Sequence, residues 1–161
     1  MLSSLKPVFY VQVSPERLAI RNAKTGEHIA EPPEVAIAYE PKAKIIAVGS
    51  GARGHLATGS VKVVNPFGHP RSLVSDFTVG EQLLKAFLRR MQGRSVLAIA
   101  PRVVLHLQGN PAGGFTQVEI RAFHEMAFSA GASEVVVWQG RSLSDQELIS
   151  GQFPSEGQVL S

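Results

Sequence analysis

The sequence contains no cysteine among its 161 residues, which excludes disulfide bonds, thiolate metal sites and cysteine nucleophiles. It also has no apolar run near the roughly 18 to 20 residues that a membrane-spanning helix needs, so no membrane span is expected. The N-terminus has no basic segment followed by an apolar core and a small-residue cleavage site, which argues against a secretory signal. We therefore expect a cytoplasmic protein.

Charge is sparse as well, since 18% of the residues are charged and the formal net charge is +3. The basic residues are scattered and form no stripe with aromatic residues between them, so the sequence does not favour nucleic-acid binding. With 44% apolar residues, the chain is long enough to bury a core without a structural metal. We expect one domain over residues 1–161, with its core at about 8–148 and a polar tail at 149–161.

The first half of the chain shows the patterns of strands. Period-two alternation predicts a hairpin from Phe9–Val13 and Leu18–Ile20, joined by the turn Ser14–Arg17. Shorter apolar runs predict three further strands, at Glu34–Tyr39, Lys44–Val48 and Val61–Val64.

The second half alternates helices with strands. Apolar residues at helical spacing predict a helix over Thr78–Met91, capped by Asp76 or Thr78, and a second helix over Gln117–Ala130. The apolar stripe of the second helix is expected to consist of Val118, Ala122, Phe123 and Met126. The strands expected here are Arg102–Leu107, after an approach segment from Ser95, and Val135–Trp138, with a helical turn at Leu143–Leu148.

This order of elements predicts an α/β fold. Strands come first, and helix, strand, helix and strand follow. The sequence therefore favours a mixed sheet in which an antiparallel meander is extended by parallel strands through two crossover helices.

The stretch "GSGARG", Gly49–Gly54, matches the G-x-G-x-x-G pattern of dinucleotide sites. In such a site a long helix follows the glycines, and an acidic residue about twenty positions later holds a ribose. Neither feature is present, because the strand-like Val61–Val64 follows and no acid occurs between Glu40 and Asp76. We interpret Gly49–Gly59 as a loop or at most one helical turn.

A second glycine-rich stretch, "GNPAGG" at Gly109–Gly114, lies between a predicted strand and a helix N-terminus, where free amides can bind an anion. No lysine or hydroxyl residue follows in the Walker pattern, and Pro111 lacks an amide hydrogen. We interpret this stretch as a plain connection.

The stretch "TQVE", Thr116–Glu119, has the spacing of a capping box, in which each side chain satisfies a free backbone amide. The five histidines, by contrast, show no metal-ligand spacing, and no serine, histidine and aspartate follow the order of a hydrolase triad. We therefore expect structural or surface roles for the histidines.

Three stretches taken together resemble the bacterial actin homologue MreB family: "HIAEPPEVAIAYEPKAKIIAVG", "VSDFTVGEQLLKAFLRRM" and "PRVVLHLQGNPAGGFTQVEIRAFHEMAFSAGASEVVVW". The corresponding family segments are N-E-P-S-V-V-A-I before A-V-G, an A-D-F-x-V-T-E helix, and a P-R-V-V-I-x-V-P unit. The match runs from about Val8 to Leu148 and covers only the first half of such a protein. The resemblance implies an actin-like ATPase domain of the ribonuclease-H-like fold, in agreement with the α/β organisation.

The departures from this family concern its phosphate site. Family members open with D-x-G-T, whose acid organises magnesium and whose loop amides and hydroxyl hold phosphate. The matching positions here are Gln12, Ser14 and Pro15. A neutral amide replaces the charge, and proline removes a donor and fixes φ. The resemblance therefore implies that this turn has lost its phosphate function.

Two further comparisons with the family point the same way. The family's E-E-P falls on Gln139, Gly140 and Arg141, and its second phosphate loop lies in a second domain outside the resemblance. Glu119 matches the glutamate thought to position the attacking water, but a helix cap explains it more simply. We expect no catalytic, cofactor-binding or metal-binding residue in this chain, and no cofactor.

These observations favour a non-enzymatic, degenerate MreB-like half-molecule, a pseudo-ATPase that acts through protein–protein contact. The expected partner is MreB, another cell-shape component or a second copy of this chain. The alternative is a nucleotide-binding or ATPase half-domain whose cleft is completed by a partner chain. A third reading is a scaffold unrelated to cell shape that shares only the fold.

Overall fold

The computed structural model describes residues 5–56, 59–69, 74, 76–93 and 98–161. Its elements in chain order are β1 (Val8–Val13), β2 (Leu18–Asn22), β3 (His28–Glu31), β4 (Val35–Ala38), β5 (Lys44–Val48), the 3₁₀ helix η1 (Gly49–His55), β6 (Val61–Val64), α2 (Phe77–Gln92), β7 (Arg102–Leu107), α3 (Gln117–Ser129), β8 (Glu134–Gly140), α4 (Asp145–Ser150) and β9 (Gly157–Val159). The approach segment expected from Ser95 lies partly outside the described residues.

A six-stranded sheet in the order β3-β2-β1-β7-β8-β9 forms the body of the molecule. β1, β2 and β3 form an antiparallel meander, and β7 and β8 add in parallel to β1. β9 closes the far edge antiparallel to β8. The predicted mixed sheet with a meander and parallel strands is confirmed, and the strand expected at Arg102–Leu107 has the bounds of β7.

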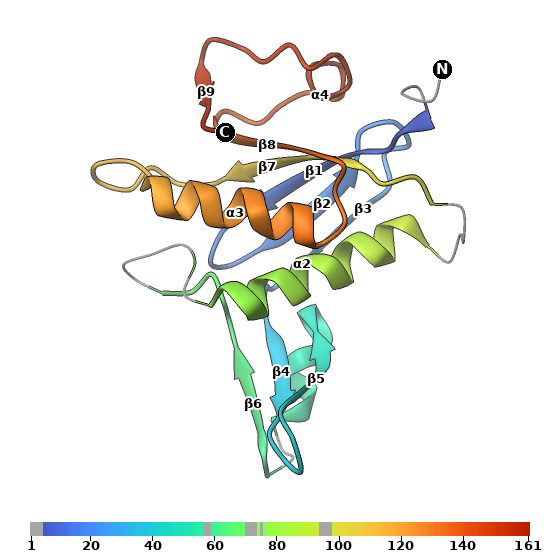
Figure 1. Cartoon of the computed structure of the whole chain (residues 1–161), viewed down its shortest axis with the longest axis vertical. Coiled ribbons are helices and arrows are strands. Elements are labelled where there is room, and N and C mark those ends of the chain that lie inside the picture. Colours follow the sequence, from blue (N-terminus) through green and yellow to red (C-terminus); the bar gives the residue numbers. More distant parts are fainter. Residues whose placement is uncertain (1–4, 57–58, 70–73, 75, 94–97) are drawn as a thin grey trace.

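Helices α2 and α3 lie side by side on one face of this sheet, which we call the inner face (Figure 1). Both predicted helices are confirmed to within one residue at each end. At the start of α2, the Asp76 carboxylate accepts a hydrogen bond from the Val79 amide at 3.0 Å, as expected of an N-cap.

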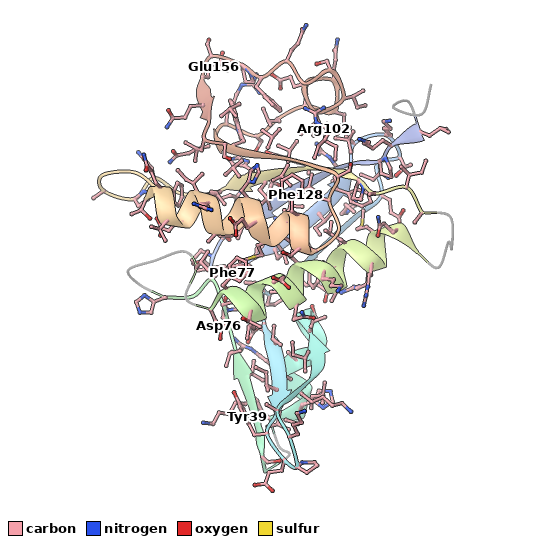
Figure 2. The ribbon with its side chains drawn as sticks, viewed as in Figure 1. Tyr39, Asp76, Phe77, Arg102, Phe128 and Glu156 are labelled. Atoms are coloured by element: carbon pink, nitrogen blue, oxygen red, sulfur yellow. The ribbon has the colours of Figure 1, made fainter. Side chains whose placement is uncertain are left out.

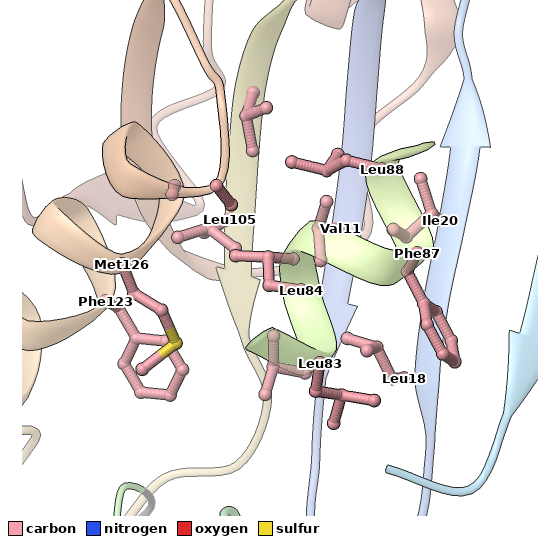
Figure 3. Close-up of a cluster of buried hydrophobic side chains, with 14 of the residues drawn as sticks. Val11, Leu18, Ile20, Leu83, Leu84, Phe87, Leu88, Leu105, Phe123 and Met126 are labelled. Atoms are coloured by element: carbon pink, nitrogen blue, oxygen red, sulfur yellow. The ribbon is translucent and has the colours of Figure 1, made fainter. Parts of the chain in front are cut away.

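The main hydrophobic core lies between α2, α3 and the inner face (Figure 3). Leu83, Leu84, Phe87 and Leu88 of α2 recur at helical spacing, so they form one apolar stripe. They pack with alternate residues of the strands, among which are Val11, Leu18, Ile20 and Leu105. Burial of these side chains fixes the sheet and both helices in one unit.

The predicted stripe of α3 is partly wrong. Val118 is 79% exposed and Ala122 does not belong to the core, whereas Phe123 and Met126 are fully buried. The residues that face the core are Ile120, Phe123, Met126, Ala127 and Ala130. Because they recur every three or four positions, they form one face of α3, and Val118 in the first turn does not lie on that face.

The strands predicted at Glu34–Tyr39, Lys44–Val48 and Val61–Val64 do not join the large sheet. β4 and β5 form a separate three-stranded sheet with β6, in the order β5-β4-β6, and this sheet projects beyond α2 (Figure 1). Pro32 and Pro33 precede it and Pro66 follows it, so both connections contain residues without an amide donor. The expectation of a single mixed sheet is therefore corrected to two sheets.

The stretch Gly49–Gly59, expected to be a loop or one helical turn, contains the seven-residue η1. Ala52 of η1 packs against Ala36 and Val61, which explains why this glycine-rich stretch is ordered on the small sheet. Residues 57 and 58 lie outside the described residues.

The opposite, outer face of the large sheet carries its own hydrophobic cluster. Tyr10, Val104 and Trp138 from the strands pack there with Leu143 and Leu148 at and near α4. The segment expected to be a polar tail returns through β9 to pair with β8 (Figure 1). In the part of the chain that the structure describes, no helix has the length and apolarity to cross a membrane.

Candidate functional site

The turn between β1 and β2 occupies the position where the related family holds phosphate. The Ser14 amide donates to the Arg17 carbonyl at 3.0 Å, and the Arg17 amide donates to the Ser14 hydroxyl at 3.1 Å. Pro15 has no amide hydrogen, so three of the four turn residues offer no free amide to a ligand. The fourth residue, Glu16, adds a negative charge. This turn is closed on itself and is a poor cradle for an anion.

The hairpin tip is also tied to the small sheet. The Asn65 side-chain amide donates to the Pro15 carbonyl at 2.7 Å. A cavity of about 580 Å³ lies beside this contact, lined by Pro15, Glu16, Pro32, Pro33, Glu34, Ser50, Arg53 and Asn65. Both oxygens of Glu34, which is nearly buried, accept from the Arg53 Nε at 2.9 Å. Arg53, the cation among the described residues that line this cavity, is therefore already paired with a carboxylate.

Gln12, at the position of the family's magnesium-organising acid, lies on the outer face of the sheet. Its side-chain amide is 3.5 Å from the Ser142 hydroxyl, at the limit of a hydrogen bond. A neutral amide at this position supplies neither the charge nor the second oxygen that a hard cation such as Mg²⁺ prefers. Among the described residues, no group of three or more His, Asp or Glu side chains is placed to hold a metal.

A buried hydrogen-bonded chain crosses the outer face next to Gln12. The Leu143 amide donates to the Tyr10 hydroxyl at 3.1 Å, and this hydroxyl lies 2.5 Å from the His106 Nδ1. The His106 Nε2 lies 2.8 Å from the Gly140 carbonyl, which can only accept. The network therefore assigns the proton to Nε2 and makes Nδ1 the acceptor of the Tyr10 hydroxyl. His106 is neutral in this arrangement.

Burial lowers the pKa of His106, and the hydrogen bond to the Gly140 carbonyl opposes this only in part. This pairing could not be predicted from local sequence patterns, because Tyr10 and His106 are 96 positions apart. A histidine in an otherwise largely apolar strand was the available clue. The network joins β1, β7 and the segment after β8, so it has a structural role.

We expect stability to fall when the solution is acidified below about pH 6.5. The unfolded chain binds a proton on His106 at its ordinary pKa of 6.5, and the folded chain does so only at a lower pH. The stabilisation is therefore complete above that value and is lost as the pH falls through the folded pKa. Urea unfolding at several pH values between about 7.5 and 5, the range in which histidine side chains titrate, measures this loss of unfolding free energy.

The His106→Gln variant should show a flatter dependence on pH in the same range. His124→Gln is the matched control, since His124 lies on α3 against the ring of Phe128 and not in the network. If His106→Gln kept the full slope, the neutral-histidine assignment would be wrong.

The loop Gly109–Gly114 lies at the carboxyl end of β7, as predicted. With the end of β8 and the segment before β9 it lines a shallow cavity of about 520 Å³. The lining residues are Gly109, Asn110, Gln139, Gly140, Ser155, Gly157 and Gln158. None of them is charged, so this cavity has no group to compensate phosphate charge.

Gln139, Gly140 and Arg141, at the family's E-E-P, have structural roles here. The Arg141 guanidinium donates to Glu147 at 2.7 and 3.0 Å and to Glu156 at 2.5 Å. This arginine lowers the pKa of Glu147 to about 2. Arg141 therefore holds α4 and the approach to β9 together, and its cluster lies at the top of Figure 2, where Glu156 is labelled.

The predicted role of Glu119 as a helix cap is confirmed. Its carboxylate accepts from the Thr116 amide at 2.8 Å, and the Glu119 amide donates to the Thr116 hydroxyl at 3.1 Å. A second capping box, Ser144 with Glu147, opens α4. The S-x-x-E spacing of Ser144 and Glu147 is the sequence pattern typical of such a box.

The substitution Glu119→Ala should lower the free energy of unfolding by ~0.5 to 2 kcal/mol, the scale of a lost capping interaction. Glu125→Ala is the control, because its exposed pair with Arg121 should contribute only about 0.2 to 0.5 kcal/mol. Chemical denaturation measures both. A variant as stable as the parent that had lost a measurable hydrolysis activity would point instead to a catalytic Glu119.

The glycine-rich Gly49–Gly54 binds a carboxylate from within the chain. The Ser50 amide donates to Glu31 at 2.9 Å, and Arg90 of α2 pairs with the same carboxylate. Gly49 has a positive φ of 70°, and a Cβ there would lie 2.2 Å from a Glu31 oxygen. The glycine is required by this internal contact, and the dinucleotide reading has no support.

Comparison with known protein families and curated proteins gives a consistent result. A model described as MreB/Mbl protein matches residues 17–143. The cell shape-determining protein MreB of Escherichia coli (strain K12) is 36% identical over 116 residues, which cover 68% of this chain and 31% of that protein. MreB of Haemophilus influenzae is 33% identical over 115 residues, covering 70% and 32%. The chain spans about a third of the length of these relatives.

Solved structures agree on the fold. The crystal structure of MreB5 of Spiroplasma citri bound to ADP matches with a TM-score of 0.64 and 21% identity, over 82% of this chain and 37% of that one. The MamK double helical filament matches with a TM-score of 0.61 and 10% identity, over 82% and 40%. The fold of this chain is therefore actin-like.

Proposed function

Because this chain belongs to the MreB/Mbl family of actin-like proteins, we propose that it is a non-catalytic member that acts through protein–protein contact in a cell-shape or cytoskeletal role. The proposed setting is the cytoplasm. The unit that acts is taken to be a single domain over residues 1–161.

The observation that carries the proposal is the closed turn Ser14–Arg17. The Ser14 and Arg17 amides are paired within the turn, Pro15 has no amide hydrogen, and the neighbouring Gln12 lacks the charge that organises a metal. Glu119 is engaged in its capping box, and the cavity at the ends of β7 and β8 is neutral. Each of these supports a role in which no nucleotide is hydrolysed.

The partner in this proposal is an MreB-type protein or a second copy of this chain. The relatives at 33% and 36% identity are named as cell shape-determining proteins, and a neighbour of the same fold forms a double helical filament. A contact role needs only the folded surface, so it is compatible with the loss of the phosphate turn.

Titration calorimetry with ATP and magnesium at about 0.15 M ionic strength tests the loss of nucleotide binding. We expect no saturable heat, since scattered positive charge attracts a nucleotide only weakly at that salt. Micromolar binding that disappears without magnesium would overturn the proposal in favour of a half-domain completed by a partner chain.

Sedimentation velocity of the protein alone, and mixed with a purified MreB-type protein, tests the contact role. A complex in either sample is expected. If the protein sedimented as a free monomer in both, the contact role proposed here would be wrong.

A further inference from the structure

The outer face of the meander contains a hollow formed by small side chains. Residues in register across the three strands form two rows, Tyr10–Arg21–His28 and Gln12–Ala19–Ala30. The second row holds two alanines beside the long side chains of the first. The outer cluster around Trp138 involves β1, β7 and β8, so Ala19 and Ala30 lie beyond its cover.

This hollow is a cavity of about 230 Å³, lined by Tyr10, Gln12, Arg17, Ala19, Ile20, Arg21 and His28. Its volume is below the roughly 300 to 1,000 Å³ of pockets for drug-sized ligands. It therefore suits an anion of a few heavy atoms and not a nucleotide.

Two arginines stand on either side of Ala19, which forms the floor. Ala19 and Arg21 alternate within β2, so their side chains project from the same face, and Arg17, the residue before β2, lines the same cavity. No carboxylate lines the cavity. The Arg17 guanidinium makes no ion pair within the described part of the chain, and its charge is uncompensated there.

Arg21 is held in place but is incompletely hydrogen-bonded. Its Nη2 contacts the Asp145 carboxylate at 2.8 Å and the Leu143 carbonyl at 3.4 Å, and its guanidinium carbon lies 5.6 Å from the centre of the Tyr10 ring. Its Nε is buried and has no acceptor among the described residues. A buried donor without an acceptor is rare in folded proteins and needs an explanation, and here it belongs to a residue that lines the cavity.

We propose that this cavity binds a small oxyanion, a phosphate or a short carboxylate, between Arg17 and Arg21. Guanidinium groups match the planar geometry of carboxylate and phosphate through paired hydrogen bonds. The Gln12 amide, which lies 3.5 Å from the Ser142 hydroxyl and also interacts with the Tyr10 hydroxyl, is a further neutral donor of the lining. This site lies on the outer face and does not depend on the proposed contact function. The anion is either free or the side chain of an acidic segment of a partner.

The test is nuclear magnetic resonance titration of the full chain, labelled with ¹⁵N, at constant ionic strength. The probes are inorganic phosphate, succinate and a five-residue glutamate peptide. We expect saturable shifts of the amides of β1, β2 and β3, and an affinity weakened on the order of tenfold in Arg17→Gln, as for a lost charge-assisted hydrogen bond. Arg121→Gln, an exposed arginine of α3 on the inner side, is the matched control and should bind like the parent.

Arg21 also packs against Tyr10 and pairs with Asp145, so Arg21→Gln is informative only if its spectrum shows a folded protein. If it does not, Arg17→Gln alone decides the outcome. Phosphate or succinate bound more tightly than the peptide identifies a free anion as the ligand. Peptide bound more tightly identifies an acidic partner segment. Absence of saturation with every probe, or equal weakening in Arg121→Gln, would overturn the proposal.

Discussion

Replacing Trp138 with alanine is expected to lower the free energy of unfolding by ~3 to 5 kcal/mol, the range for large aromatic side chains removed from a core. Trp138 is 1% exposed and is the largest fully buried side chain among the described residues. Its ring packs against Phe153 with 5.5 Å between centroids, and its Nε1 donates to the Arg141 carbonyl at 2.9 Å. The substitution therefore removes both apolar burial and a hydrogen bond.

Urea unfolding followed by circular dichroism measures this loss. Phe128→Ala is the matched control, because Phe128 is also aromatic but is 44% exposed on α3 (Figure 2). Its loss should be well under half of that for Trp138. Similar losses in the two variants would show that the outer cluster contributes little to stability.

The second large effect is expected for Gly157→Ala, which should detach β9 from β8. A Cβ at Gly157 would lie 2.4 Å from Trp138 Cζ2 and 2.6 Å from the Gln139 carbonyl oxygen, both far inside contact distance. The carbonyl belongs to the backbone of β8 and cannot move aside cheaply. Overpacking of this kind costs typically about 1 to 3 kcal/mol.

Limited proteolysis followed by mass spectrometry should show cleavage in the segment around β9 before the rest of the chain. Gly54→Ala is the control, since a Cβ at Gly54 meets nothing within 4 Å and φ there is not positive. Parent-like protection of Gly157→Ala would mean that the β8–β9 contact adapts more easily than its geometry indicates.

The features that the sequence predicted well are those encoded by neighbouring residues. The stripe Leu83, Leu84, Phe87 and Leu88 lies within six positions, and the capping box of Glu119 spans four. Local hydrogen bonds and periodic burial suffice to specify such elements. The helix bounds and β7 were therefore predictable without knowledge of what they pack against.

The elements that were missed depend on distant partners. β3 has only Ile29 and Glu31 half-buried, and it is a strand because the edge of β2 is available to pair with it. β9 is three residues long, and its pairing with β8 is what makes it a strand. The division into two sheets likewise follows from long-range pairing, which residue patterns do not encode.

Only the loss of the phosphate turn could be predicted from the sequence. Gln12 and Pro15 stood at the family's phosphate positions, so the closed turn could be anticipated from residue chemistry. The Tyr10–His106 network and the hollow between Arg17 and Arg21 could not, because each arises where side chains from separate strands share one face.

The position of the small sheet bears on how the chain reaches its native topology. β1 pairs with β7 through Val8 and Arg102, 94 positions later, and the excursion over residues 35–64 lies inside that interval. Val35 pairs directly with Val64, so the two ends of this excursion lie next to each other. The excursion therefore adds little to the distance that the chain must span between β1 and β7. Loop-closure entropy grows only with the logarithm of length, so the excursion adds only ~0.3 kcal/mol to the cost of bringing β1 and β7 together. The slow step of folding should therefore be set by the parallel pairing of β1 with β7, and only weakly by the thirty residues inserted between them.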